Sequence, residues 1–217
     1  MKWLILILIL SCSVGVFSAD VANFENLGFS YNSRYFMFGQ YGVDDSKSAP
    51  YAEIFIINVS TNKYAPNGAH KVTYQDSKLQ PGQSGFGALI TLLKNKAFLS
   101  SRYQINHMKP GRFLYILVNG SEPGTTLNFR DFNTGFRYYV NLIQEGSSFY
   151  IKLTVTNSKG VERNYTVGRP GYNRKWVTGY KIWQVILSPD EKSLIFVIEK
   201  EKRDGSVRYM IETVSIK

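Results

Sequence analysis

Cysteine is almost absent from this sequence, and histidine is scarce. The only cysteine, Cys12, lies among the first twenty of 217 residues, and neither His70 nor His107 has a partner at metal-ligand spacing. We therefore expect no disulfide, no metal site and no cofactor in the chain beyond residue 19. Roughly 200 residues can bury one adequate apolar core without covalent cross-links, so the fold is expected to depend on packing alone.

Long hydrophobic runs are also lacking, except at the N-terminus. Lys2 is followed by an apolar stretch that is short for a membrane span and ends in small residues before Asp20, which is the pattern of a signal peptide. We predict that residues 1–19 are removed by cleavage after Ser18 or Ala19, and that the mature chain has no transmembrane helix. Residues 9–12 form a loose lipobox, so lipid anchoring through Cys12 is the less favoured alternative. Either route predicts a periplasmic or secreted protein.

Acidic residues are few compared with basic ones. The chain has 26 Lys and Arg against 16 Asp and Glu, and loss of Lys2 with the signal peptide leaves a net charge of about +9. Outside the cytoplasm, this balance favours an envelope glycan, an anionic lipid or an acidic envelope protein as partner, and not nucleic acid. The simpler interpretation is that the charge serves solubility alone.

The sequence is rich in aromatic residues, with 15 Tyr and 14 Phe. Many stand in short runs with Val, Ile and Thr between turn-forming residues, which is typical of strands. Residues 144–147 and 157–160 have the composition of hairpin turns. We predict a mainly β fold of antiparallel sheets, with strands at 35–38, 53–58, 113–119, 127–132, 136–144, 149–157, 161–167, 180–187, 194–199 and 207–215.

One segment has helical periodicity. Between Phe86 and Ile105 the apolar residues recur at helical spacing, which predicts one amphipathic helix over about 87–103 that packs against a sheet. No proline-rich linker or change of composition divides the chain. We therefore expect a single β-rich domain over residues 20–217.

Two distant segments share one pattern. Residues 29–38 and 187–196 each contain an apolar residue, a serine, a turn with Asn32 or Asp190, a cation two positions later, and a strand. The Asn or Asp side chain can bond its own backbone and tighten the turn. This device resembles the turn-and-strand repeat in the blades of periplasmic β-propellers. Two copies are too few for a propeller, so we predict a propeller-like pair of sheets or a β-sandwich.

Together with residues 39–54 and 168–182, this pattern resembles a family of predicted secreted bacterial proteins whose domain has no assigned function. The resemblance covers about residues 24–213 and is most specific over 179–213. It implies a signal peptide and a location in the cell envelope. The family offers no catalytic residues to transfer to this chain.

Catalytic motifs are not evident. Neither Gly120-Ser121-Glu122 nor Gly146-Ser147-Ser148 has the nucleophile-elbow pattern, and the spacing of residues singles out no Ser-His-Asp set. A pair of glycosidase carboxylates would be separated in the sequence and would not be recognisable. We expect no catalytic residue, and we favour a protein that is not an enzyme.

The strongest interaction signal combines aromatic rings with cations. Such a segment can stack on sugars and pair with anionic groups, and loops on rigid sheets commonly carry binding sites. The alternative is that the rings fill the core while the cations are solvated. If the first and last hairpins are neighbours, two residues near the N-terminus can form a second lip. The candidate binding residues are Arg169, Tyr172, Arg174, Lys175, Trp176, Tyr180 and Lys181, with Arg34 and Tyr41 in the second lip.

The leading hypothesis is a non-catalytic envelope protein that binds an anionic or glycan component through this basic aromatic segment. One alternative is a carboxylate-dependent glycan hydrolase, which requires two acids about 5–9.5 Å apart in a cleft. Another is an envelope assembly or structural factor, for which a large exposed apolar patch would be the sign.

Overall fold

The computed structural model describes residues 20–44, 47–77, 83–118 and 124–217. The expected signal peptide and Cys12 lie outside these residues. Strands dominate the described chain, as predicted. The elements are β1 (Asn23–Ser30), β2 (Tyr35–Asp44), β3 (Ala49–Asn58), β4 (Lys63–Thr73), α1 (Phe86–Asn95), α2 (Ala97–Arg102), β5 (Ile105–Asn106), β6 (Arg112–Ile116), β7 (Thr126–Arg130), β8 (Arg137–Glu145), β9 (Ser148–Thr156), β10 (Glu162–Gly168), β11 (Val177–Leu187), β12 (Ser193–Lys202) and β13 (Val207–Ser215).

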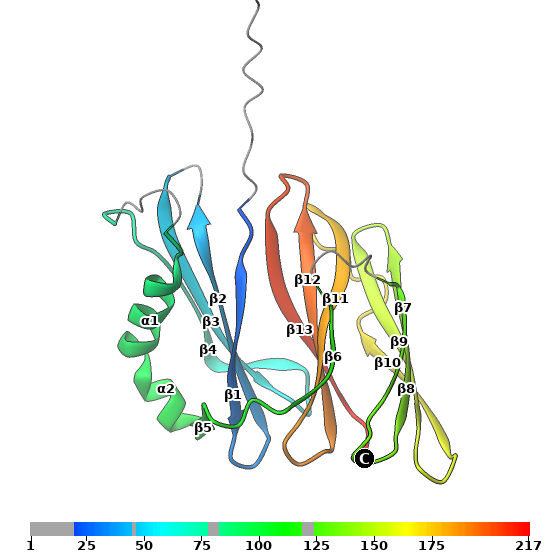
Figure 1. The fold of residues 1–217 in the computed structure, drawn as a ribbon. Coiled ribbons are helices and arrows are strands. Elements are labelled where there is room, and N and C mark those ends of the chain that lie inside the picture. The colour runs from blue at the N-terminus through cyan, green and yellow to red at the C-terminus, as the bar shows by residue number, and fades with distance from the viewer. Residues whose placement is uncertain (1–19, 45–46, 78–82, 119–123) are drawn as a thin grey trace, which may run out of the picture.

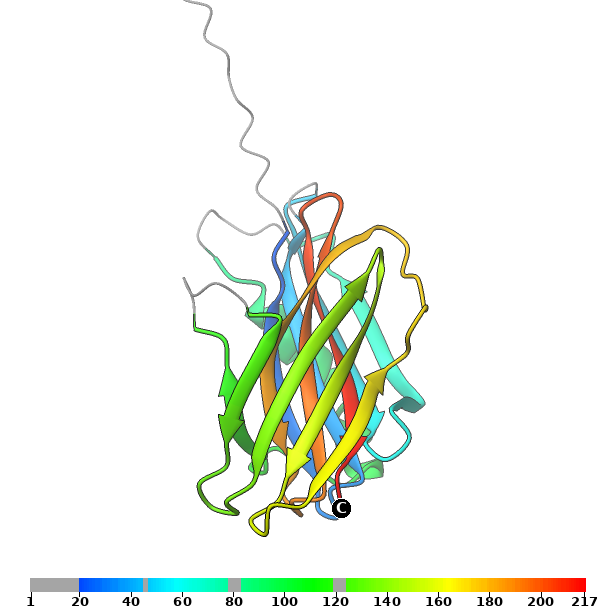
Figure 2. The ribbon, with the colours of Figure 1, turned by 90° about the vertical axis from the view of Figure 1, so that its right-hand side faces the viewer.

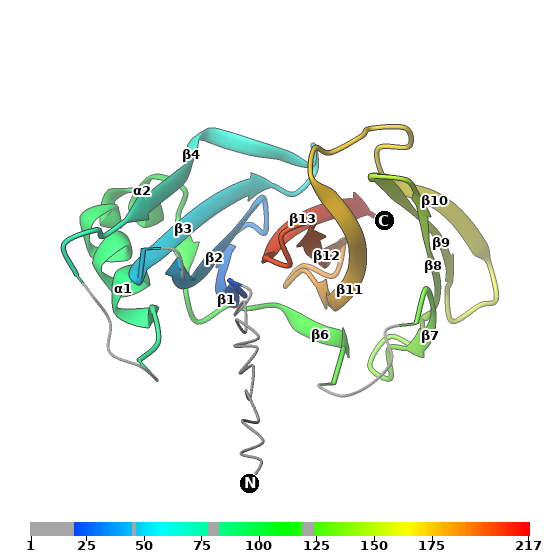
Figure 3. The ribbon, with the colours of Figure 1, turned by 90° about the horizontal axis from the view of Figure 1, so that it is seen from above.

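The strands form three antiparallel sheets, which we call sheets I, II and III (Figure 1). Their strand orders are β4-β3-β2-β1-β5, β13-β12-β11-β6 and β10-β9-β8-β7. Seen from above, the sheets stack face to face with sheet II in the middle, and α1 and α2 lie on the outer side of sheet I (Figure 3). The sheets do not close into a barrel or a ring of blades. The predicted sandwich-like class is therefore confirmed, and the resemblance to a propeller does not extend beyond the local repeat.

Sheet II is buried on both faces. In β12, every residue from Leu194 to Ile198 has no measurable exposure to solvent. Because successive side chains of a strand point to opposite faces, Phe196 packs in the core shared with sheet III, whereas Ile195 and Val197 pack in the core shared with sheet I. A strand covered on both sides reads as a continuous apolar run, as β12 does.

The helical segment is broken at Lys96, so the single helix predicted over 87–103 is two helices. Lys96 has φ −116° and ψ 21°, outside the helical region. In a continuous helix, Leu89 and Leu99 would be rotated by about 80° from one another, since ten residues turn through about 1000°. The break lets both leucines, each at most 1% exposed, pack against sheet I.

The repeated turn has the same hydrogen bonds in both copies. In the β1–β2 turn, the Ser30 hydroxyl donates to Asn32 at 2.8 Å and accepts the backbone N–H of Tyr35 at 2.9 Å. In the β11–β12 turn, the hydroxyl of Ser188 donates to Asp190 at 2.6 Å and accepts the N–H of Ser193 at 3.0 Å. The predicted local device is confirmed, and it starts the second strand of equivalent hairpins in sheets I and II.

Sheets II and III are joined at one end by a buried ion pair. Arg112 in β6 donates to Asp131, which follows β7, and to Glu191 at 2.6 Å. The Asp131 side chain is 2% exposed. Burial acts to raise the pKa of Asp131, but hydrogen bonds from Thr134, from the N–H of Asn133 and from Arg112 outweigh it and hold the pKa below its usual value.

Replacing Asp131→Asn tests this link. Because the folded-state pKa is lowered, the carboxylate stabilises the fold above its unfolded pKa of about 3.9, and this contribution is lost as the pH falls toward the folded value. We expect the variant to lose about 1–3 kcal/mol at pH 7 and to show a shallower fall in stability below about pH 4. Urea unfolding at several pH values measures both effects. If the variant loses stability below about pH 4 as steeply as the wild type does, the assignment is contradicted.

Candidate functional site

The segment singled out from the sequence is the connection between β10 and β11, residues 169–176, which carries the chain from sheet III to sheet II. We call it the β10–β11 loop. It is fixed by backbone hydrogen bonds, because Arg174 donates its N–H to Ser147 at 3.1 Å and Trp176 accepts the N–H of Arg203 at 2.8 Å. Trp176 has φ 66°, a left-handed conformation that is uncommon outside glycine. The loop therefore presents its side chains from a restrained backbone.

Arg174 points inward and has a structural role. Its guanidinium carbon lies 4.8 Å from the ring centre of Phe149 and 5.0 Å from that of Tyr172, and its Nη2 lies 3.3 Å from Glu212 in β13. Glu212 is 6% exposed and also accepts a hydrogen bond from Asn62 of the β3–β4 turn. Burial raises the pKa of Glu212, opposed by the Asn62 hydrogen bond and the Arg174 charge. This cluster connects all three sheets.

Two further predicted residues are also engaged within the fold. Tyr180 is 6% exposed, packs in the core between sheets II and III and donates its hydroxyl to Ser147 at 2.7 Å. Lys181 forms an ion pair with Glu199 on the adjacent strand at 3.2 Å. The position of Tyr180 agrees with the alternative interpretation from the sequence, namely that its ring fills the core.

The structure does not bring Arg34 and Tyr41 to the loop. Arg34 lies in the β1–β2 turn at the lower end of sheet I in Figure 1, whereas the β10–β11 loop runs behind the upper part of sheets II and III. Tyr41 lies on the other side of sheet I, where its ring packs edge-on to Phe86 of α1 at 5.3 Å. The two repeated hairpins, β1–β2 and β11–β12, do belong to adjacent sheets, but their turns lie at the lower end of the sheets in Figure 1, away from the loop.

Four of the predicted residues remain exposed in the loop: Arg169, Tyr172, Lys175 and Trp176. Arg169 lies over the ring of Tyr172 at 5.4 Å, and Trp176, 67% exposed, is covered in part by Arg203 at 5.6 Å. Among the described residues, no carboxylate lies within ion-pair distance of Arg169 or Lys175. The loop can therefore offer cations and ring faces to a ligand.

Lys200 in β12 lies among cations that the sequence analysis did not connect with this loop. Burial, together with the charges of Lys202, Lys71 and Arg174, lowers the pKa of Lys200 to about 8. Burial is the larger cause, and the three neighbouring cations add to it. The contributing cations come from β4, β12 and the loop, so no local sequence motif could have revealed them.

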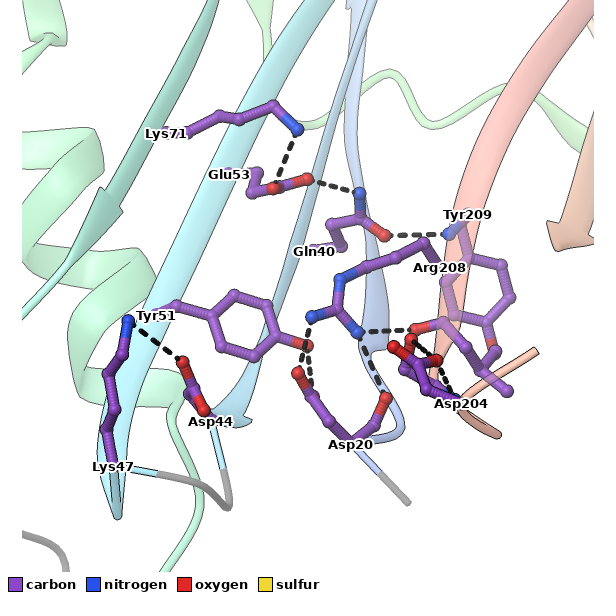
Figure 4. A network of polar contacts seen from close by, with 12 residues as sticks. Asp20, Gln40, Asp44, Lys47, Tyr51, Glu53, Lys71, Asp204, Arg208 and Tyr209 are labelled. Atoms are coloured by element: carbon purple, nitrogen blue, oxygen red, sulfur yellow. Dashed lines mark hydrogen bonds and ion pairs between the residues drawn. The ribbon is translucent and has the colours of Figure 1, made fainter. Parts of the chain in front are cut away.

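A second polar cluster, also missed by the sequence, lies between sheets I and II (Figure 4). Asp20 accepts hydrogen bonds from Tyr51 at 2.8 Å and from Arg208 at 2.5 Å, while Lys71 lies 2.8 Å from Glu53. These residues line a hollow of about 250 Å³. Asp20 and Arg208 are 188 residues apart, so neighbouring sequence could not indicate the pair.

This hollow bears on the hydrolase hypothesis, because it gathers three carboxylates. Each has a cation within ion-pair distance: Asp20 has Arg208, Glu53 has Lys71, and Asp44 has Lys47 at 3.5 Å. The Asp20 carboxylate and backbone also hold the start of β1 against β13. The Asp20–Arg208 pair thus joins sheet I to sheet II, whereas the Glu53–Lys71 and Asp44–Lys47 pairs lie within sheet I and its β2–β3 hairpin.

Two searches of the described residues concern other kinds of site. No three His, Cys, Asp or Glu side chains within residues 20–44, 47–77, 83–118 and 124–217 are grouped closely enough to hold a metal ion. Over the same ranges, neither helix is long and apolar enough to cross a membrane.

Comparison with known proteins identifies a family but no characterised relative. A family model described as "predicted secreted protein (DUF2259)" matches residues 37–215, most of the chain. No match was found among curated proteins.

Arg174→Ala tests the structural role of that side chain. The variant leaves Glu212 buried without its cation, so we expect a loss of about 3–5 kcal/mol in the free energy of unfolding. Lys175→Ala, at the exposed neighbouring position, should change stability by no more than about 0.5 kcal/mol. Denaturant unfolding of both variants makes the comparison, and equal stabilities would contradict the inward role of Arg174.

Proposed function

Since the chain belongs to the DUF2259 family of predicted secreted proteins, we propose that it works outside the cytoplasm, in the periplasm or after secretion, as a non-catalytic module that binds an anionic or glycan component of the cell envelope. The binding residues in this proposal are Arg169, Tyr172, Lys175 and Trp176. Arg174 supports them from beneath, and Tyr180 and Lys181 belong to the scaffold.

The observation that carries this proposal is the exposure of cations and aromatic rings on a restrained loop. Trp176 is 67% exposed although large aromatic side chains are usually buried, and Lys175 beside it has no acidic partner among the described residues. An exposed ring next to an unpaired cation suits a ligand that has both a flat sugar face and negative charge. Because hydrogen bonds to Ser147 and Arg203 fix the backbone, ordering the loop costs little on binding.

The charges in the hollow near Asp20 do not favour the hydrolase alternative, since each carboxylate there already has a cation within ion-pair distance and the Asp20–Arg208 pair joins sheets I and II. Loss of either partner there would leave a part-buried charge without its counter-ion. A binding module needs no such acid pair, and within the described part of the chain neither Arg169 nor Lys175 forms an ion pair.

We expect the double variant Lys175→Ala/Trp176→Ala to weaken retention on envelope material at least tenfold, since central aromatic and cationic contacts dominate binding energies. The protein from residue 20 onward is assayed against purified cell-wall glycan, anionic vesicles and an envelope protein extract, at low and high salt. Retention on glycan or vesicles that falls with salt is the expected result, because exposed charge pairs are screened.

The matched control is Tyr31→Ala/Arg34→Ala. It also removes one cation and one exposed ring, because Tyr31 is 65% exposed and Arg34 is an exposed cation in the same turn. This control should bind like the unaltered protein. Equal losses of retention in both double variants would show that net charge alone explains the effect. Unchanged retention of the loop variant would overturn the proposal. Retention by protein extract alone would favour the assembly role.

A further inference from the structure

Sheet III has one face without a covering layer. Sheet I is covered by helices and sheet II by the other two sheets, but the outer face of sheet III is turned to solvent (Figure 2). The inward residues of β8 and β9, such as Val140 and Ile151, have no exposure, whereas alternate positions point outward. The outward residues of this face are not those assigned above to the β10–β11 loop, which begins directly after Gly168 at the end of β10.

The strand register arranges the outward side chains in rows across the four strands. One row is Asn128, Tyr139, Thr154 and Asn164. The row on one side is Thr126, Asn141, Lys152 and Thr166, and the row on the other is Arg130, Arg137, Thr156 and Glu162. Successive rows are about 6.6 Å apart, since each strand rises about 3.3 Å per residue. The face is thus a regular array of amides, hydroxyls, cations and a tyrosine, with one carboxylate, Glu162, at its edge.

The array is hollowed in two adjoining places. A hollow of about 380 Å³ is lined by residues of the first two rows, including Tyr139, Asn141 and Lys152. A second hollow of about 290 Å³ lies over Arg130, Arg137 and the β9–β10 turn. Because Thr154 and Thr156 on β9 border the two hollows in turn, they follow one another along the strand direction.

The outward rows of sheet III carry more positive than negative charge. The three rows named above contain Arg130, Arg137 and Lys152 against the single acid Glu162, and residues 126–168 as a whole have five Lys and Arg against three Asp and Glu. Of the three acids, Asp131 is paired with Arg112 of sheet II. No ion pair with a described carboxylate engages Arg130, Arg137 or Lys152.

These groups suit a polar, negatively charged chain. Arg137 lies opposite Arg130 in the register, so two guanidinium groups are available for carboxylates. Amides and hydroxyls donate and accept hydrogen bonds, as sugar hydroxyls require, and Tyr139 exposes 49% of its surface for stacking. A membrane-binding face would instead expose several large apolar side chains, and along the outward rows only Ile143 is apolar.

We propose that the outer face of sheet III binds a linear polysaccharide with carboxylate groups. The chain runs along the strand direction, its sugar rings lie on Tyr139, and its carboxylates pair with Arg137 and Arg130 at one end and with Lys152 at the other. This surface and the β10–β11 loop use different residues, so either proposal can fail without the other.

The test measures binding of polygalacturonate, a linear polymer of uronic acids, by affinity electrophoresis with the protein from residue 20 onward. Fully methyl-esterified polygalacturonate keeps the chain and lacks the charge. Wild-type protein should bind the acid form at least tenfold more tightly than the ester. Arg137→Gln/Lys152→Gln should weaken binding of the acid form at least tenfold, and Tyr139→Thr should weaken binding of both forms.

The matched control, Lys94→Gln/Arg102→Gln, also removes one lysine and one arginine charge, but from the helices on the opposite side of the molecule. It should bind polygalacturonate within twofold of wild type. Equal binding of acid and ester, no binding by wild type, or equal losses in both charge variants would overturn the proposal. Lys175→Ala/Trp176→Ala is assayed in parallel for polygalacturonate binding, to distinguish this surface from the β10–β11 loop. If that variant alone loses this binding, the polysaccharide binds the loop and the outer-face assignment is wrong.

Discussion

Burial of sheet II on both faces is the constraint on which the other layers depend. An apolar run such as Leu194 to Ile198 cannot face water on either side, so sheet I must cover one face and sheet III the other. Sheet I in turn has an apolar outer face, which α1 and α2 cover. Sheet III can end the stack because its outward side chains are polar. The order of layers thus leaves one broad face of the sheets free for a ligand.

Much of the fold could be predicted because the signals are local. Strands such as β9 show their period of two, and the turns at Asn32 and Asp190 depend on hydrogen bonds within five residues. Other elements have no such signal. β4 contains Pro66 and Gly68 and lies at the edge of its sheet, where the lost backbone donor is tolerated, so its sequence does not resemble a strand. β1 is interrupted by a bulge at Gly28.

The candidate site was predicted less completely than the fold, because the role of a side chain depends on distant partners. Arg174 and Lys175 are neighbours with the same charge, yet Arg174 is committed to Glu212 and Lys175 is exposed. Only the position of β13 beneath the loop separates these roles. The alternation of apolar and polar residues in β8 and β9 is local, but the rows that carry the cations depend on the register with β7 and β10, which aligns residues up to 40 positions apart.

The contact between the first and last strands also has a consequence for the order of folding. Val21 bridges Val207, the N–H of Val207 bonds Asp20, and Arg208 bonds the Asp20 carboxylate. A chain that crosses a membrane from its N-terminus exposes residues 20–22 early and β13 last. The interface between sheets I and II therefore closes only when nearly the whole chain has emerged. Sheet III, whose strands are consecutive hairpins, needs no such delay and can form while the C-terminus is still in transit.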